Sequence, residues 1–126
     1  MRGAFVDTSV LLAETFAEVP ASIPRDALRS IDVVMASRLL EAEFLSACSR
    51  ERLSPRMDVL DAITWIDSTR SLTAEISRVL AAGYVNGADC WHLATALSVA
   101  PDPGDVVFLT LHVRQRVVAK KLGFRV

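Results

Sequence analysis

The chain has 126 residues, of which 52% are apolar and 23% charged, so we expect one domain with a sizeable core and exclude intrinsic disorder. Its formal net charge of -1 gives no overall attraction for nucleic acid, and no apolar stretch approaches the roughly 20 residues that span a bilayer. The sequence therefore predicts a cytoplasmic protein without membrane contact, with residues 1–126 forming a single domain.

Short apolar runs alternate with helical patterns along the chain. In chain order the predicted elements are a strand over 3–6, a helix over 8–13, a loop over 18–30 with a short helix at 25–29, a strand over 32–36, helices over 37–53, 55–65, 71–82 and 88–100, a strand over 106–109, a helix over 113–122 and a last strand over 124–126. Thr8 or Ser9 and Ser37 are placed as N-caps, and Gly83 and Gly123 as C-caps. This alternation predicts an α/β fold in which helices cover both faces of a mostly parallel sheet.

Polar residues follow two of the predicted strands, at the sheet edge where α/β proteins bind ligands. Asp7 directly follows the first strand, and Thr110 and His112 follow the strand over 106–109. A second interpretation of Asp7 is an ordinary helix cap or turn residue, because an aspartate at this position accepts hydrogen bonds from nearby backbone N–H groups.

Asp89 lies within the apolar face of its predicted helix. At 100° per residue its side chain points between Leu93 and Ala96, and an acid facing the core costs several kcal/mol unless it is paired or binds a metal. The alternative is a first-turn acid favoured by the helix dipole, with Asn86 as the N-cap.

The helix after Ser37 carries Glu41 and Glu43, which lie on opposite borders of its apolar face, so the helical period does not choose between them. Carboxylates about 4 Å apart repel by on the order of 4 kcal/mol at an effective dielectric of 20, so a cluster of acids holds protons or binds a hard divalent cation. Such ions activate water for phosphodiester cleavage, which makes nuclease chemistry the natural interpretation.

The end of the chain is basic. No acid follows Asp105, and the last 21 residues carry five cations, Arg114, Arg116, Lys120, Lys121 and Arg125. This distribution is expected either of a local phosphate-binding face or of an ordinary solvated helix face.

Four stretches resemble, in order and spacing, the sequence blocks of PIN domains, and most closely the toxin ribonucleases of type II toxin-antitoxin modules, often called VapC. These stretches are FVDTSVLL, SRLLEAEFLSA, GADCWHLATAL and FLTLHVRQRVVAKKLGFRV. The resemblance implies a PIN-like three-layer α/β/α fold with a sheet of four or five strands. It also implies an acidic pocket that binds Mg²⁺ or Mn²⁺ and cleaves RNA.

The resemblance assigns roles to particular residues. Its first acid falls on Asp7, its second on Glu43 and its third on Asp89, which together would bind the metal. The hydroxyl residue beside the first acid corresponds to Thr8 or Ser9, expected to contact substrate, and the threonine of the fourth block corresponds to Thr110.

His112 departs from the family pattern, because the fourth block normally has an aspartate there. The imidazole removes one negative charge, or two if it is protonated, and it is a poorer ligand for Mg²⁺ than for Mn²⁺. Three outcomes follow: altered activity with His112 as a ligand, proton donor or substrate contact, weak cleavage, or binding without catalysis. We favour retained but altered activity.

The sequence hypothesis is therefore a metal-dependent toxin endoribonuclease in which Arg114 and Arg116 help to position RNA. The resemblance also implies a VapB-like antitoxin as partner and a homodimer. The alternative is a catalytically impaired domain that only binds RNA or antitoxin. His92 is interpreted as structural, and Cys48 and Cys90 as buried thiols.

Overall fold

The computed structural model describes residues 2–15 and 31–126. The predicted loop over 18–30, with its short helix at 25–29, lies outside the described residues. The described elements are β1 (Gly3–Val6), α1 (Thr8–Thr15), β2 (Val33–Ser37), α3 (Arg38–Arg50), α4 (Met57–Asp61), β3 (Thr64–Ile66), α5 (Thr73–Ala82), α6 (Gly87–Val99), a 3₁₀ turn (Pro103–Asp105), β4 (Val106–Leu109) and α7 (Val113–Leu122). None of these helices combines the length and apolar character needed to cross a membrane.

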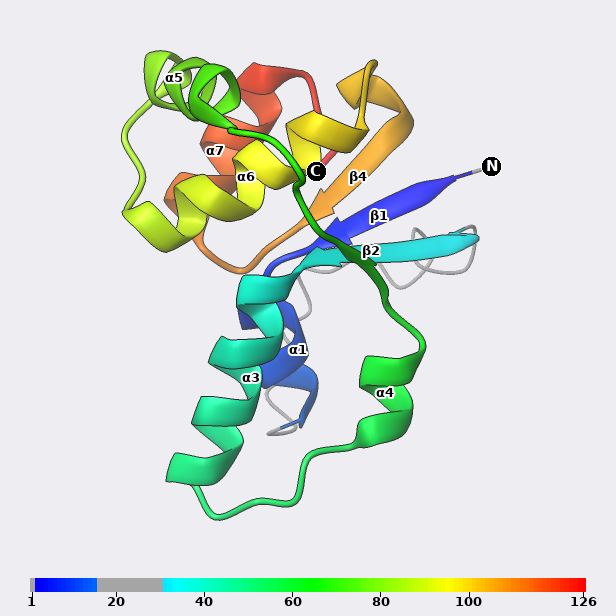
Figure 1. Ribbon diagram of the computed structural model, residues 1–126. Coiled ribbons are helices and arrows are strands. Elements are labelled where there is room, and N and C mark those ends of the chain that lie inside the picture. The colour runs from blue at the N-terminus through cyan, green and yellow to red at the C-terminus, as the bar shows by residue number, and fades with distance from the viewer. Residues whose placement is uncertain (1, 16–30) are drawn as a thin grey trace.

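The described strands form one parallel, four-stranded sheet in the order β3-β2-β1-β4. Strand β1 lies in the interior of the sheet, with β2 on one side and β4 on the other (Figure 1). The predicted α/β fold with a parallel sheet between helices is confirmed.

Alternation along the strands sends side chains into two separate cores. On β1, Phe5 packs into the core beneath α5, α6 and α7, and it stacks on Phe108 of β4 with ring centroids 5.7 Å apart. Ala4 and Val6 point the other way, into the core shared with α1, α3 and α4. Because both faces are covered, the strands are apolar at nearly every position, as parallel strands usually are.

The predicted helix through Trp65 is wrong at its C-terminal end. Helix α4 stops at Asp61, and Thr64–Ile66 forms the edge strand β3 beside β2. Thr64, Trp65 and Ile66 are β-branched or aromatic residues that favour a strand. Their alternate side chains reach both cores, which a continued helix would not allow.

The predicted last strand is reduced to a single bridge. Arg125 pairs in parallel with Val107, and its backbone N–H donates to Val106 O at 3.1 Å. Gly123 ends α7 with a φ of 105°, the left-handed conformation that favours glycine, as its predicted C-cap role requires. Both cysteines are buried and free, as expected.

Candidate metal centre

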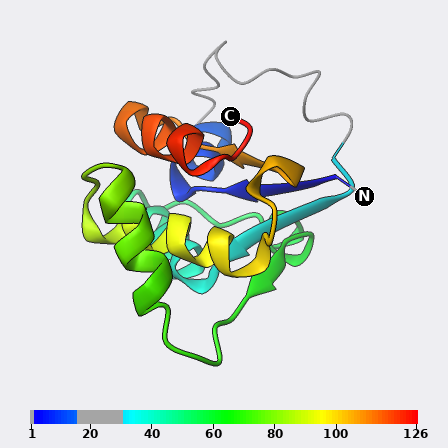
Figure 2. The ribbon, with the colours of Figure 1, turned by 90° about the horizontal axis from the view of Figure 1, so that it is seen from above.

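The candidate site lies where the chain changes direction across the sheet. Strand β1 is followed in the chain by β2 on one side, whereas β4 pairs with its other side, so the carboxyl ends of β1 and β4 form a topological switch point. The backbone N–H of Asp7 donates to Leu109 O at 2.9 Å and joins these two ends. In Figures 1 and 2 the starts of α6 and α7 lie at this same end of the sheet.

Asp7, Asp89 and His112 converge at this point. Each offers one ligand atom, and these atoms lie within 4.8 Å of one another. His112 Nδ1 is 3.1 Å from Asp89 Oδ1 and 3.7 Å from Asp7 Oδ2, so the imidazole faces both carboxylates. The three residues come from the end of β1, the first turn of α6 and the residue that precedes α7.

The Asp7 carboxylate is almost fully buried, at 1% exposure of the residue, and backbone and side-chain groups hold it by hydrogen bonds. Its Oδ2 accepts from the Ser9 N–H at 3.0 Å, and its Oδ1 accepts from Gln115 Nε2 at 3.3 Å. The Thr110 hydroxyl lies 3.5 Å from Oδ2. Asp7 is thus a turn residue, because its carboxylate accepts a hydrogen bond from the start of α1. The same carboxylate also lies beside Asp89 and His112.

Asp89 likewise combines both interpretations of the sequence. Asn86 caps α6 by accepting from the Asp89 N–H at 2.9 Å, while the Asp89 side chain is buried beside His112. Burial raises the pKa of the Asp89 carboxyl, the nearby Asp7 charge adds to this increase, and His112 opposes it. A cation bound beside this carboxyl would stabilise its charged form.

Glu43 belongs to a neighbouring network and is not one of the three converging residues. Its Oε1 accepts from the Thr8 hydroxyl at 2.8 Å and lies 2.8 Å from His92 Nε2. His92 Nε2 is also 3.7 Å from Asp7 Oδ1, so the histidine connects the two acids. Glu41, by contrast, is exposed and pairs with Arg38 at 3.1 Å.

Ser37 completes this network from the end of β2. It occupies the N-cap position of α3 but makes no side-chain cap, and its hydroxyl instead lies 2.9 Å from His92 Nδ1. The predicted capping role of Ser37 is therefore wrong. Thr8 does not cap α1 with its side chain either, because its hydroxyl donates to Glu43.

The cluster suits a divalent cation by its composition and spacing. Two carboxylates and an imidazole supply hard oxygen ligands and one borderline nitrogen. Adjacent ligands around an octahedral ion stand about 3 Å apart, close to the 3.1 and 3.7 Å between His112 and the two acids. The donor set therefore fits a metal ion of the Mn²⁺ type better than Mg²⁺.

Two buried polar residues of the site were not singled out from the sequence as functional. Gln115 accepts from the Thr110 hydroxyl and donates to Asp7 Oδ1 and to the Asp89 carbonyl. It shares the helix face of Val118, Ala119 and Leu122, and this polar residue in an apolar stripe was the available signal. His92 was noted only as structural.

The predicted substrate residues lie around the site in different settings. Ser9 Oγ accepts from the Leu111 N–H at 3.1 Å and so braces the loop after β4. Arg114 and Arg116 are exposed on the first turn of α7. The guanidinium of Arg114 lies over the Tyr84 ring at 5.6 Å from its centroid.

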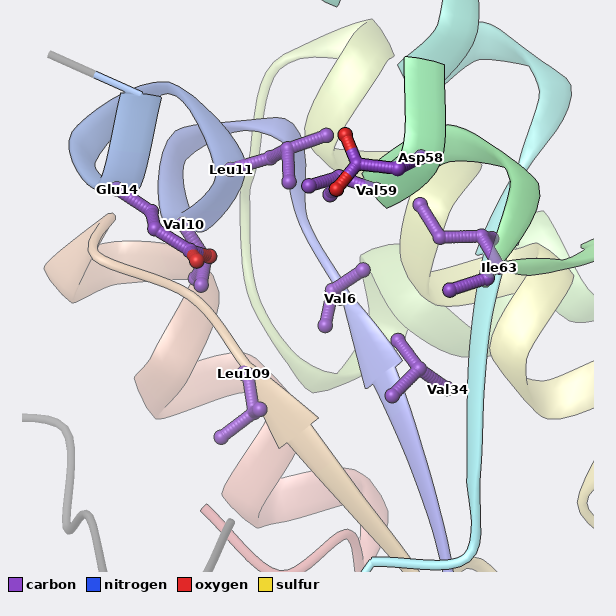
Figure 3. A pocket seen from close by; sticks show the side chains of 10 residues that line it. Val6, Val10, Leu11, Glu14, Val34, Asp58, Val59, Ile63 and Leu109 are labelled. Atoms are coloured by element: carbon purple, nitrogen blue, oxygen red, sulfur yellow. The ribbon is translucent and has the colours of Figure 1, made fainter. Parts of the chain in front are cut away.

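A separate apolar hollow of about 370 Å³ lies on the α1 and α4 side of the sheet (Figure 3). Val6, Val34 and Leu109 form its sheet wall, and Glu14 and Asp58 are its only charged lining residues within the described chain. Asp58 is already paired with Arg56 at 2.7 Å. The hollow therefore lacks the converging acids that distinguish the strand-end site.

Comparison with protein families gives a match to the PIN domain over residues 4–100. Asp7, Glu43 and Asp89 lie within the matched range, whereas Thr110 and His112 follow it. Comparisons with curated proteins and with solved structures give no match. PIN domains are generally nucleases that use divalent metal ions, and with most of its length matched this chain belongs to the PIN domain family.

Proposed function

We propose that the protein is a metal-dependent endoribonuclease and the toxin of a type II toxin-antitoxin module. The observation that carries the proposal is the convergence of Asp7, Asp89 and His112 at the switch point of a PIN-type sheet. A divalent ion bound there would supply activated water and charge stabilisation for phosphodiester cleavage.

The residues around the proposed ion have different roles. Asp7 and Asp89 hold the ion, and Gln115 keeps the Asp7 carboxylate in the required orientation. Glu43 is held 2.8 Å from His92 and would contact the ion through water rather than as a close ligand. His112 is half exposed, so it is a metal ligand that substrate can also reach.

The proposed substrate and partners follow from charge and from the family resemblance. Arg114 and Arg116 lie on the turn that follows His112, where they would contact the RNA backbone. We also propose a VapB-like antitoxin whose arginine enters the acidic site, since a guanidinium forms paired hydrogen bonds with carboxylates. A homodimer is proposed as the assembly, and Mg²⁺ or Mn²⁺ as the ion.

The second candidate function is binding without cleavage. The observation that favours it is the contact between His112 Nδ1 and Asp89, because a protonated imidazole there would substitute for a cation. Such a domain would still bind RNA or antitoxin.

The test is cleavage of RNAs with single-stranded loops by the purified protein in Mg²⁺ and, separately, in Mn²⁺. Asp7→Asn should abolish cleavage, and Glu43→Gln should reduce it strongly. Glu41→Gln is the matched control, because this glutamate lies on the same helix and its ion pair within the described chain is with Arg38 at the surface. The nuclease proposal fails if neither ion supports cleavage that Asp7→Asn removes.

His112→Asp separates the two candidate functions. If this variant cleaves while the wild-type protein does not, the natural chain is a binding domain that has lost catalysis. If the wild-type protein already cleaves in Mn²⁺, His112 is part of a working site.

A further inference from the structure

An exposed aromatic ring and a guanidinium meet beside the candidate metal centre. Tyr84 is 69% exposed, and Arg114 lies over its ring at 5.6 Å from the centroid. Exposed aromatic rings and guanidinium planes are among the few protein surfaces on which unpaired bases stack.

The chain places this pair close to the proposed chemistry. Tyr84 lies in the loop that leads to Asn86, the cap of the helix that carries Asp89. Arg114 lies two residues after His112, whose ring contacts Asp89 at 3.1 Å. In both Figure 1 and Figure 2 the loop between α5 and α6 and the start of α7 lie at the same end of the molecule as the strand tips.

An apolar hollow adjoins the exposed ring. It has a volume of about 400 Å³, within the roughly 300–1,000 Å³ range of ligand pockets. Its lining residues are all uncharged: Ile76, Leu80, Tyr84, Val85, Gly87, Cys90 and Trp91. Two of them, Gly87 and Cys90, flank Asp89 on its own helix. The hollow thus lies between α5 and α6, on the side of α6 turned about 100–200° from Asp89, and Tyr84 at its rim connects it to Arg114.

The charge around the hollow suits a polyanion. Arg114 stands at its Tyr84 rim, and Lys121, seven residues further on, shares the same face of α7. Glu75, the one acid of α5, is already paired with Arg70 at 2.9 Å. An RNA strand can therefore place a phosphate at Arg114 and an unpaired base against Tyr84.

We propose that Tyr84, Arg114 and the adjoining hollow form a subsite for an unpaired nucleobase next to the scissile bond. This inference rests on the proposed ribonuclease function and names the side chains that would contact a base beside the cleaved phosphate. Tyr84 supplies the stacking face, and Arg114 both orders the ring and contacts phosphate.

The experiment measures RNA binding in the Asp7→Asn background, where cleavage is blocked, with a short labelled single strand and the matching duplex as probes. Tyr84→Ala should weaken single-strand binding about tenfold and leave duplex binding and the salt dependence unchanged. Tyr84→Phe keeps the ring and should restore most of the lost affinity. Arg114→Ala should weaken binding and also reduce the salt dependence.

Arg50→Ala is the matched control for Arg114→Ala, because it removes one exposed arginine at the end of α3, which has no part in the proposed subsite. A single strand with one abasic position gives the second control: where the missing base is the stacked one, the parent should lose affinity and Tyr84→Ala should lose no more.

Two results overturn the inference in distinguishable ways. If the wild-type protein cleaves RNA but Tyr84→Ala binds the single strand as tightly as its parent, the subsite is wrong and the proposed function stands. If the wild-type protein neither binds nor cleaves RNA, both fail.

Discussion

His92 is the buried side chain that connects Glu43 with Asp7 and with Ser37. Because a carboxylate only accepts hydrogen bonds, the 2.8 Å contact with Glu43 Oε1 requires that His92 Nε2 donate. The Ser37 hydroxyl, 2.9 Å from Nδ1, can either donate a hydrogen bond to Nδ1 or accept one from it. His92 is therefore a positioning residue for Glu43.

We expect His92→Leu to lower metal affinity or turnover by about 10–100-fold, as loss of a group that orients site carboxylates commonly does. His92→Gln can keep a donor near the Nε2 position and should retain much more of both. Calorimetric titration with Mn²⁺ and single-turnover cleavage provide the measurements, and urea unfolding checks stability. Equal metal affinity and turnover in both variants would contradict this role.

Asp89 gives a pH-dependent prediction for the metal-free protein. Burial raises its pKa above the ordinary value of 3.8, so the folded protein holds this proton more tightly than the unfolded chain does. Between the two pKa values the folded state binds more protons, and its stability falls as pH rises. At higher pH the cost of the buried charge is fully present.

Asp89→Asn lacks this titration, so its free energy of unfolding relative to wild type should increase as pH rises from about 4 to about 7. Urea unfolding in chelator at several pH values measures the difference. Asp58→Asn is the control, since Arg56 lowers the pKa of that exposed carboxyl and its difference from wild type should stay nearly constant over this pH range. A constant or decreasing difference for Asp89→Asn would show that the burial effect does not dominate.

His112 sets an expectation for metal choice. An imidazole nitrogen suits Mn²⁺ better than Mg²⁺, which prefers oxygen ligands. The wild-type protein should therefore show a larger ratio of Mn²⁺ to Mg²⁺ affinity than His112→Asp, measured by competition calorimetry. Equal ratios in the two proteins would mean that His112 does not bind the ion.

Gln115 connects α7 to the rest of the site. It is fully buried and bonds to the end of β4 through Thr110, to Asp7 after β1 and to the Asp89 carbonyl of α6. A single side chain thus links three segments that are distant in sequence.

Gln115→Leu should destabilise the fold by about 1–3 kcal/mol, because its buried partners lose their hydrogen bonds and no water can easily replace them. Denaturant unfolding measures this loss. Val117→Ala, at a 49% exposed position of the same helix, is the control and should change stability by less than about 0.5 kcal/mol. Similar effects for the two variants would mean that the Gln115 bonds contribute little.

The sequence predicts elements well where periodicity is strong, and the errors occur where tertiary contacts decide. The β1, β2 and β4 strands follow from short apolar runs, whereas β3 was assigned to a helix because Thr64–Ile66 is too short to show a period. Asp7 and Asp89 stood out as acids in apolar surroundings. The Ser37–His92 and Gln115–Asp7 contacts span 55 and 108 residues, so no local pattern identifies these two contacts.

At the scale of the whole molecule, one sheet separates two cores. Trp91 packs against the core beneath α5, α6 and α7, and Trp65 against the core shared with α1, α3 and α4. The sheet strands contribute to both cores through alternate residues, so neither core is complete without the sheet. Because both cores include residues of the same sheet, we expect a single cooperative domain.

The two tryptophans test that expectation directly. Trp65→Phe leaves Trp91 as the reporter of one core, and Trp91→Phe leaves Trp65 as the reporter of the other. In each variant the fluorescence transition in urea should coincide with the loss of helical circular dichroism, because melting either core exposes the sheet that supports the other. Far-ultraviolet dichroism of the wild-type protein controls for destabilisation by the substitutions. If either variant's fluorescence changed at a clearly lower denaturant concentration than its own dichroism, one core would unfold without the other and the single-unit prediction would be wrong.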